Sequence, residues 1–281
     1  MPPNIYCLMW VLYVTSCAMG QSDAVDICAV EATPWKRFEG TLVHVSVGQA
    51  GVWGVDANKL IFYKDPAYGE DPNSCEPWEL ITGSLKQLDA GKDVVWGVTS
   101  RDHIYYRQGI TPSAPKGTQW VRVPGLLKHV SVSQRGHVWG VNSNDNIFHR
   151  IGASNCNRAG DSWRQISGGL KQISVGSSGV WGVNSGDNIY YRDGTHGDPK
   201  SDPDGSGWTQ VPGALKYISS ADKVFGVNAN DAIFYRAGVS AAAPIGNAWR
   251  NIPGGLEQIE TLSCAVWGVN GNNEIYVKDI E

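Results

Sequence analysis

The 281-residue sequence has little of what nucleic-acid-binding and membrane proteins need. Its 23 Lys and Arg side chains are outnumbered by 27 Asp and Glu, which gives a formal net charge of −4 at pH 7. Without a basic surplus, binding to a phosphate backbone is not expected. Past the first 20 residues, no apolar stretch approaches the roughly 18 residues that a membrane-spanning helix needs. We therefore expect neither nucleic-acid partners nor a membrane span.

The sequence also lacks the motifs of common enzymes and metal sites. Its six histidines show no H-E-x-x-H or H-x-H spacing, and there is no G-x-S-x-G elbow and no P-loop. No acidic pair stands out that would indicate a glycosidase. Residues 198–206 offer oxygen atoms for Ca²⁺ but lack the spacing of an EF-hand, and a solvated loop is the simpler interpretation. We expect no catalytic activity, no metal site and no cofactor.

Residues 1–20 have the pattern of a secretory signal peptide. The apolar run Ile5–Val14 is too short to span a bilayer, and Ala18 and Gly20 are the small residues expected before a cleavage site. Only the α-amino group is positive ahead of the run, which departs from the usual signal. An N-terminal anchor helix or a buried strand is the alternative. We predict that residues 21–281 form the mature protein and that it is secreted to the extracellular space.

Removal of this segment would leave four cysteines. In an oxidising compartment, four cysteines predict two disulfides with three possible connectivities. A zinc site is the alternative, but the sequence has no C-x-x-C pair and the four positions lie far apart. We therefore predict disulfides among the four residues Cys28, Cys75, Cys156 and Cys264.

Tryptophan is abundant, and its placement reveals an internal repeat. Six segments open with a tryptophan, 41 to 45 residues apart, at Trp35, Trp78, Trp120, Trp163, Trp208 and Trp249. Each contains a second aromatic residue followed by Gly and Val, at Trp53, Trp96, Trp139, Trp181, Phe225 and Trp267. A period in this range is typical of propellers and of HEAT-type helical arrays. The six units lie near 35–77, 78–119, 120–162, 163–207, 208–248 and 249–281.

The local pattern distinguishes these architectures. Each unit contains short β-branched and aromatic runs, of the forms W-x-x-[I/V/F], L-K-x-[I/V]-S-V, V-W-G-V and I-[F/Y]-Y-R. Turn sequences rich in Asn, Asp and Gly separate them, as in N-S-N-D-N at 142–146. No unit has an apolar stripe with helical spacing. The sequence predicts an all-β fold, a six-bladed β-propeller that forms a single domain over residues 21–281.

The ends of the chain have to close the ring. The segment Trp35–Phe38 precedes its own inner strand, and the last unit ends with its third strand. We therefore predict that Trp35–Phe38 supplies the outer strand of the last blade. Cys28 then lies near Cys264, and a bridge between them would close a loop of more than two hundred residues. A bridge between Cys75 and Cys156 would have to cross a blade, and that pairing stays open.

The pattern G-x-L-K-x-[I/V]-S followed by W-G-V-N-S-x-D-x-I-[Y/F]-x-R resembles the tectonin repeat. The resemblance covers residues 35–278 in six copies and extends to the secreted animal lectins of that family. It implies a six-bladed propeller without catalytic activity that binds sugars such as N-acetylglucosamine and bacterial lipopolysaccharide. Three positions depart from the pattern, because Asp56 and Thr99 replace the Asn of G-V-N and Glu257 replaces the Lys of L-K.

Recurring polar residues are the candidate carbohydrate-binding set. Sugar sites combine amides and carboxylates with an aromatic surface. The alternative is that the Asn and Asp residues only form the hairpin turn, that the Arg residues only solvate an outer edge, and that the aligned lysines at 86, 128, 171 and 216 form a solvated rim. The set comprises Asp102, Asn142, Asp145, Arg150, Asn184, Asp187, Arg192, Asn228, Asp231, Arg236 and Asn270. Units three to five hold Asn, Asp and Arg together, from which we expect three to five competent sites.

Two classes of function remain. A secreted multivalent lectin would bind glycans of the N-acetylglucosamine and lipopolysaccharide type through sites repeated around the ring. An extracellular scaffold for protein partners would instead need one distinctive surface. The repetition of the polar set favours the lectin.

Overall fold

The computed structural model describes residues 33–64, 77–200, 203–262 and 265–280. Within these ranges the chain forms 24 β-strands and no helix, arranged as six antiparallel four-stranded sheets. From the inner to the outer strand, the blades are β2 (His44–Gly48), β3 (Gly51–Val55), β4 (Ile61–Lys64) and β5 (Glu79–Ile81) in blade 1; β6 (Gln87–Ala90), β7 (Val95–Val98), β8 (His103–Gln108) and β9 (Gln119–Leu126) in blade 2; β10 (His129–Val132), β11 (Val138–Val141), β12 (Asn146–Ile151) and β13 (Ser162–Gly169) in blade 3; β14 (Gln172–Gly176), β15 (Gly179–Val183), β16 (Asn188–Arg192) and β17 (Trp208–Ala214) in blade 4; β18 (Tyr217–Ser220), β19 (Val224–Val227), β20 (Ala232–Ala237) and β21 (Ala248–Gly255) in blade 5; and β22 (Gln258–Leu262), β23 (Ala265–Val269), β24 (Glu274–Asp279) and β1 (Lys36–Thr41) in blade 6.

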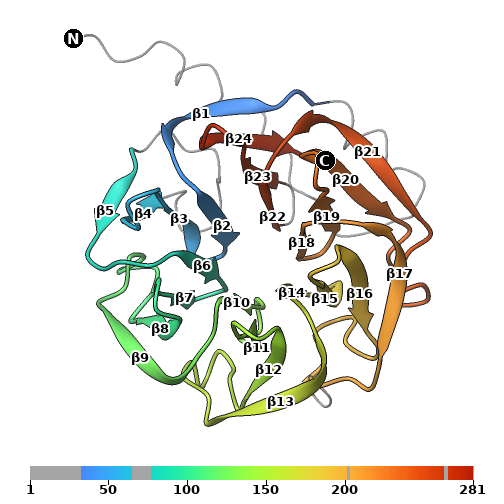
Figure 1. Ribbon diagram of the computed structural model, residues 1–281. Helices are drawn as coiled ribbons and strands as arrows, with labels where there is room; N and C mark the ends of the chain where they lie inside the picture. Colours follow the sequence, from blue (N-terminus) through green and yellow to red (C-terminus); the bar gives the residue numbers. More distant parts are fainter. Residues whose placement is uncertain (1–32, 65–76, 201–202, 263–264, 281) are drawn as a thin grey trace.

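The six sheets stand around a central axis (Figure 1), with β2, β6, β10, β14, β18 and β22 innermost. The predicted all-β six-bladed propeller is therefore confirmed. The two inner strands of each blade are almost wholly buried, and the tryptophans of the V-W-G-V runs have no exposed surface. The glycine of this run stands where the packing leaves no room for a side chain, because a Cβ on Gly182 would lie 2.5 Å from Leu170 Cδ1. These tryptophans pack between blades and form the core.

The two ends of the chain meet in blade 6. Strand β1 pairs antiparallel with β24, and Phe38 lies opposite Ile275 in the register. This confirms the prediction that the first tryptophan segment completes the last blade. The indole Nε1 of Trp35 also donates a hydrogen bond to the Pro253 carbonyl oxygen in blade 5, 2.8 Å away. Every repeat is thus shared between two blades, which joins neighbouring blades covalently and by hydrogen bonds.

The innermost strands show that the blades are joined in pairs. Around the ring, the first residue of the innermost strand is alternately a glutamine and an aromatic residue, and the aromatic residues are His44, His129 and Tyr217. Each glutamine forms backbone hydrogen bonds with the inner strand of the next blade. The other three side chains converge on the axis, where the Tyr217 hydroxyl lies 3.0 Å from His44 Nε2 and 3.3 Å from His129 Nε2. The glutamines are Gln87, Gln172 and Gln258.

Several predictions concern residues outside the described ranges. These are the signal peptide at 1–20 and the cysteines Cys28, Cys75 and Cys264, so the disulfide pairing stays a prediction. Cys156 is exposed and has no disulfide partner within the described ranges. A helix long and apolar enough to cross a membrane is not found in the part of the chain that the structure describes.

Candidate functional site

A turn of the same construction joins the second and third strands of every blade. In blade 3, Asn142 Oδ1 accepts hydrogen bonds from the backbone N–H groups of Asn144 (3.0 Å) and Asn146 (2.9 Å). The corresponding asparagines of blades 4, 5 and 6 form the same pair of bonds. The Thr99 hydroxyl and the Asp56 carboxylate supply the acceptor in blades 2 and 1. The side-chain oxygen of these asparagines therefore shapes the turn, and the Nδ2 amide is the group that the asparagines of blades 3 to 5 can offer to a ligand, whereas Asn270 Nδ2 donates to Glu274 Oε2 at 2.8 Å. The four asparagines are Asn142, Asn184, Asn228 and Asn270.

The predicted aspartates occupy the last position of these turns. Asp102, Asp145, Asp187 and Asp231 have φ values of 63° to 65°, a left-handed backbone that Asp tolerates better than most residues. Each carboxylate pairs with the lysine that precedes the inner strand of the same blade, as in the 2.5 Å contact of Lys86 with Asp102. The charge of each aligned lysine is thus balanced by one aspartate of the same blade.

The turn of blade 3 also contacts the turn of blade 4. The Ser185 hydroxyl donates to Asp145 Oδ2, while Lys128 occupies Oδ1. These two hydrogen bonds, that of Lys128 foremost, lower the pKa of Asp145. The carboxylate therefore stays ionised and holds the two turns side by side at one face of the ring.

The predicted arginines are not part of this arrangement. Arg150 follows Asp145, the residue before β12, by five positions, which at about 3.3 Å per residue places it ~16 Å away, at the opposite face. It is buried, its Nε donates to the Ala159 carbonyl oxygen at 2.8 Å, and its guanidinium lies 5.2 Å from the Trp163 ring centroid. The arginines of the other three blades repeat these contacts: Arg107, Arg192 and Arg236. The interpretation that they solvate an outer edge is wrong, and they do not converge with the Asn and Asp residues.

A groove between blades 3 and 4 lies beside the Asn–Asp turn. It encloses about 180 Å³ and is lined by Ile147, Gly168, Gly169, Leu170, Tyr190 and Trp208. The Trp208 Nε1 donates to the Ser167 carbonyl oxygen at 2.8 Å, which fixes the indole at the edge of the groove. The Leu170 N–H donates to the Asp145 carbonyl oxygen at 2.9 Å, so that the turn borders the groove. An aromatic and apolar surface next to amide and carboxylate groups is the composition of a sugar site.

The elements of this groove recur around the ring. In every blade the indole Nε1 of the opening tryptophan donates to a carbonyl oxygen in the preceding outer strand or, for Thr82, directly after it, at 2.8 to 3.0 Å. A half-buried aromatic residue of the third strand accompanies each one. These residues are Phe62, Tyr105, Phe148, Tyr190, Phe234 and Tyr276.

Sequence reasoning missed this aromatic surface, although a signal was present. Neither the opening tryptophans nor the first aromatic residue of I-[F/Y]-Y-R is among the candidate site residues that the sequence predicts. Side chains alternate between the two faces of a strand, so the residue after the buried Ile has to face away from the core of its own blade. In β16 the burial indeed alternates, with Ile189 and Tyr191 buried and Tyr190 half-exposed.

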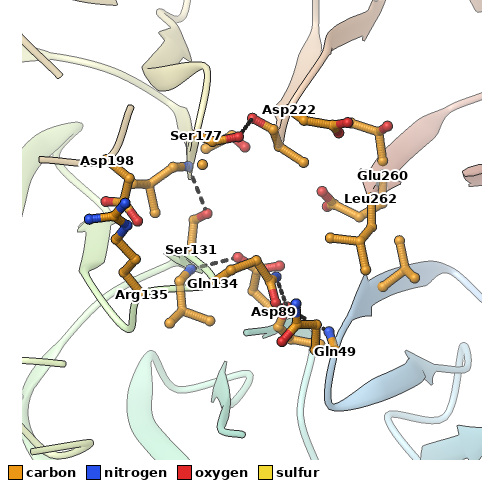
Figure 2. Close-up of a pocket in the computed structure, with 18 of the residues that line it drawn as sticks. Gln49, Asp89, Ser131, Gln134, Arg135, Ser177, Asp198, Asp222, Glu260 and Leu262 are labelled. Atoms are coloured by element: carbon orange, nitrogen blue, oxygen red, sulfur yellow. Dashed lines mark hydrogen bonds between the residues drawn. The ribbon is translucent and has the colours of Figure 1, made fainter. Parts of the chain in front are cut away.

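A second cavity lies in the central channel at the opposite face (Figure 2). It has a volume of about 190 Å³ and receives residues from all six blades, among them Asp89, Ser131, Ser174 and Glu260. Burial raises the pKa of Asp89, against hydrogen bonds from Val132 N–H and Ser46. Burial and the nearby Asp89 raise the pKa of Glu260 well above its usual range. These two acids stand where the other four repeats have serine, a departure that could have been noticed in the sequence.

The loop that was considered for Ca²⁺ has its described carboxylates engaged by basic side chains. Asp198 contacts His137 Nδ1 at 2.5 Å, and Asp204 contacts His149 Nδ1 at 2.5 Å and also Arg164. Residues 201–202 lie outside the described ranges. Within those ranges no group of three or more His, Cys, Asp or Glu side chains is placed to hold a metal ion.

Comparisons with known proteins agree on one family. The Tectonin domain model matches residues 15–160 and 75–265. A segment of 72 residues is 40% identical to the fish-egg lectin of Cyprinus carpio. This match covers 25% of the chain and 30% of the carp protein, and is thus a local one.

Solved structures share the fold at low sequence identity. Human WBSCR16 superposes with a TM-score of 0.55 at 8% identity, over 85% of this chain and 76% of that one. The β-propeller domain of Cps50 (Swd1) from Myceliophteria thermophila gives 0.52 at 9% identity, over 87% and 85% of the two chains. These similarities concern the propeller architecture alone.

Proposed function

The chain belongs to the tectonin family, and from this premise we propose that it is a secreted, multivalent lectin that binds N-acetylglucosamine-type sugars, including those of bacterial lipopolysaccharide. The observation that carries the proposal is the groove between blades 3 and 4. It places Tyr190 and Trp208 beside the turn that holds Asn142 and Asp145. The local similarity to a protein named as a fish-egg lectin supports it.

The charge distribution favours recognition of sugar over recognition of phosphate. The four lysines at the turn face are each paired with an aspartate, and the chain carries a net charge of −4. An anionic lipid headgroup would therefore meet little free positive charge. We infer that lipopolysaccharide is bound through its sugars, so that raising the salt concentration should weaken binding only slightly.

Repetition around a rigid ring suits the weak binding expected of a small groove. Several sites on one particle gain affinity by avidity when the target surface is densely glycosylated. Catalysis is not part of the proposal. Asp89 and Glu260 share the channel cavity, but Asp89 is held by Ser46 and Val132, and Glu260 by Ser219.

A glycan array with the purified protein tests the proposal. We expect signals on N-acetylglucosamine-terminated glycans that free N-acetylglucosamine displaces. Tyr190→Ala should reduce these signals while leaving the thermal transition in place, and no sugar should be released from chitin oligosaccharides. Absence of binding to any glycan on the array, together with capture of a defined protein partner, would instead favour the scaffold function.

A further inference from the structure

Two blades end their outer strand with a double glycine. These pairs are Gly168–Gly169 in blade 3 and Gly254–Gly255 in blade 5, each followed by a buried leucine. The backbone and the packing require the first glycine of each pair but not the second, and this difference bears on where a sugar can bind.

The first glycine is required by the backbone and by packing. Gly168 has a φ of +118°, and a Cβ there would lie 3.0 Å from Trp208 Nε1. Gly254 has a φ of +132°, and a Cβ there would lie 2.9 Å from Trp35 Nε1. All six repeats carry a glycine at this position, as the fold demands.

The second glycine has no such reason. Among the described residues, a Cβ on Gly169 would meet only the Asp145 carbonyl oxygen, at 3.8 Å, and one on Gly255 only that of Asp231, at 3.8 Å. Neither glycine has a φ in the left-handed region. The fold accepts side chains at this place, because the register puts Leu126 there in blade 2, Ala214 in blade 4 and Thr41 in blade 6. Glycine here leaves space that a side chain would take up.

The aromatic partner differs in the same way. The groove next to Gly169 has Tyr190, and the equivalent position next to Gly255 has Tyr276, each with a tryptophan from the same blade as the tyrosine. Next to Leu126, Ala214 and Thr41 the third-strand aromatic is a phenylalanine, which lacks a hydroxyl for a sugar. Both double glycines thus adjoin a tyrosine, whereas the third such tyrosine, Tyr105 of blade 2, adjoins Ser84, where serine replaces the second glycine.

We propose that the protein has two carbohydrate sites, one in the groove between blades 3 and 4 at Gly169 and one between blades 5 and 6 at Gly255. The proposal rests on the lectin function and specifies where and how often the sugar binds. A volume of about 180 Å³ lies below the ~300–1,000 Å³ of pockets for drug-sized ligands, and so suits a single ring. The apolar floor of Ile147 and Leu170 fits the methyl of an acetamido group, and the aromatic rings fit the C–H face of the sugar.

Calorimetric titration with N-acetylglucosamine tests this assignment. The parent protein should bind two equivalents. Gly169→Leu and Gly255→Leu, which copy the residue of blade 2, should each bind one, and the double variant none. Tyr190→Ala should also bind one equivalent and provides a second route to the same site if Gly169→Leu fails to fold. Ala214→Leu places the same side chain one blade further on and should leave the stoichiometry at two.

The outcomes separate the inference from the function on which it rests. A parent stoichiometry of two that persists in the double variant would overturn the groove assignment and leave the lectin function standing. If Ala214→Leu also loses one equivalent, the grooves are equivalent and the assignment to two of them is wrong. If the parent binds three to five equivalents, the number of sites is the one expected from the Asn–Asp turns, and the proposal of two sites is wrong. A parent that binds no glycan on the array would contradict the lectin function itself.

Discussion

Gln258 in blade 6 hydrogen-bonds both backbone groups of Val45 in blade 1. Its Nε2 donates to the Val45 carbonyl oxygen at 2.8 Å, and its Oε1 accepts from the Val45 N–H at 3.1 Å. This amide joins the last blade to the first, and Gln172 forms the same pair of bonds with Ile218 inside the ring. The closure is therefore built like an internal junction, with β1 paired to β24 as its second component.

Replacing Gln258 by leucine should destabilise the ring. The variant would leave the N–H and C=O groups of a fully buried residue without partners, at a cost of about 2–3 kcal/mol in the free energy of unfolding. Gln172→Leu is the matched control, and it should lose a similar amount if the propeller unfolds as one unit. Urea unfolding followed by tryptophan fluorescence measures both. A change below about 0.5 kcal/mol in Gln258→Leu would contradict the role of this junction.

Glu260 should make the stability depend on pH. Its pKa is raised in the folded protein by burial and by Asp89, so the folded state binds a proton that the unfolded state has already released. The contribution is fully present below the ordinary pKa of 4.5 and is lost as the pH rises from there towards the folded value. Glu260→Gln should therefore gain stability relative to the parent as the pH rises from 5 to 9.

The control for this experiment is Glu257→Gln, which changes an exposed carboxylate three positions away. Urea midpoints at several pH values give the difference between each variant and the parent. A constant difference for Glu260→Gln across the pH range would show that this carboxyl titrates normally in the folded protein.

The disulfide between Cys28 and Cys264 stays a prediction that peptide mapping can test. In the sequence, Cys28 precedes β1 and Cys264 lies between β22 and β23, and all three strands belong to blade 6. Digestion of the protein without reduction should release a linked peptide that contains both residues. A peptide that links Cys28 to Cys75 would contradict the pairing.

The repeats made the propeller and its closure predictable, because each tryptophan segment has to find a third strand to pair with. The roles of the polar residues were harder to predict. Arg150 and Asp145 recur together in the sequence, but a six-residue strand carries them to opposite faces of the ring. Asp89 and Glu260 meet in the channel although 171 positions separate them, and only the structure shows that their blades face one cavity.

Two substitutions of Asn142 should distinguish its role in the turn from its role in sugar binding. Asn142→Ala removes two hydrogen bonds to backbone N–H groups and should cost about 1 kcal/mol. Asn142→Asp keeps the oxygen acceptor, as Asp56 does in blade 1, and should be nearly as stable as the parent. It removes the Nδ2 donor, so binding of N-acetylglucosamine at the adjoining groove should weaken. Calorimetric melting and titration of both variants measure the two effects, and unchanged sugar binding in Asn142→Asp would exclude this amide from the site.

Arg150 should prove structural and not sugar-binding. Its guanidinium bonds the Ala159 carbonyl oxygen and covers the half-buried Trp163, and the arginine side chain itself is buried. Arg150→Met should therefore lower the free energy of unfolding by about 1–3 kcal/mol. Arg150→Lys should lose less, because blade 6 holds Lys278 over Trp35 in the equivalent place, 5.9 Å from the ring centroid. Both variants should keep the parent's stoichiometry for N-acetylglucosamine in calorimetric titration, since Arg150 and Trp163 do not line the groove at Gly169. If Arg150→Met stays stable but binds one equivalent of sugar fewer, the result would show that Arg150 takes part in sugar binding.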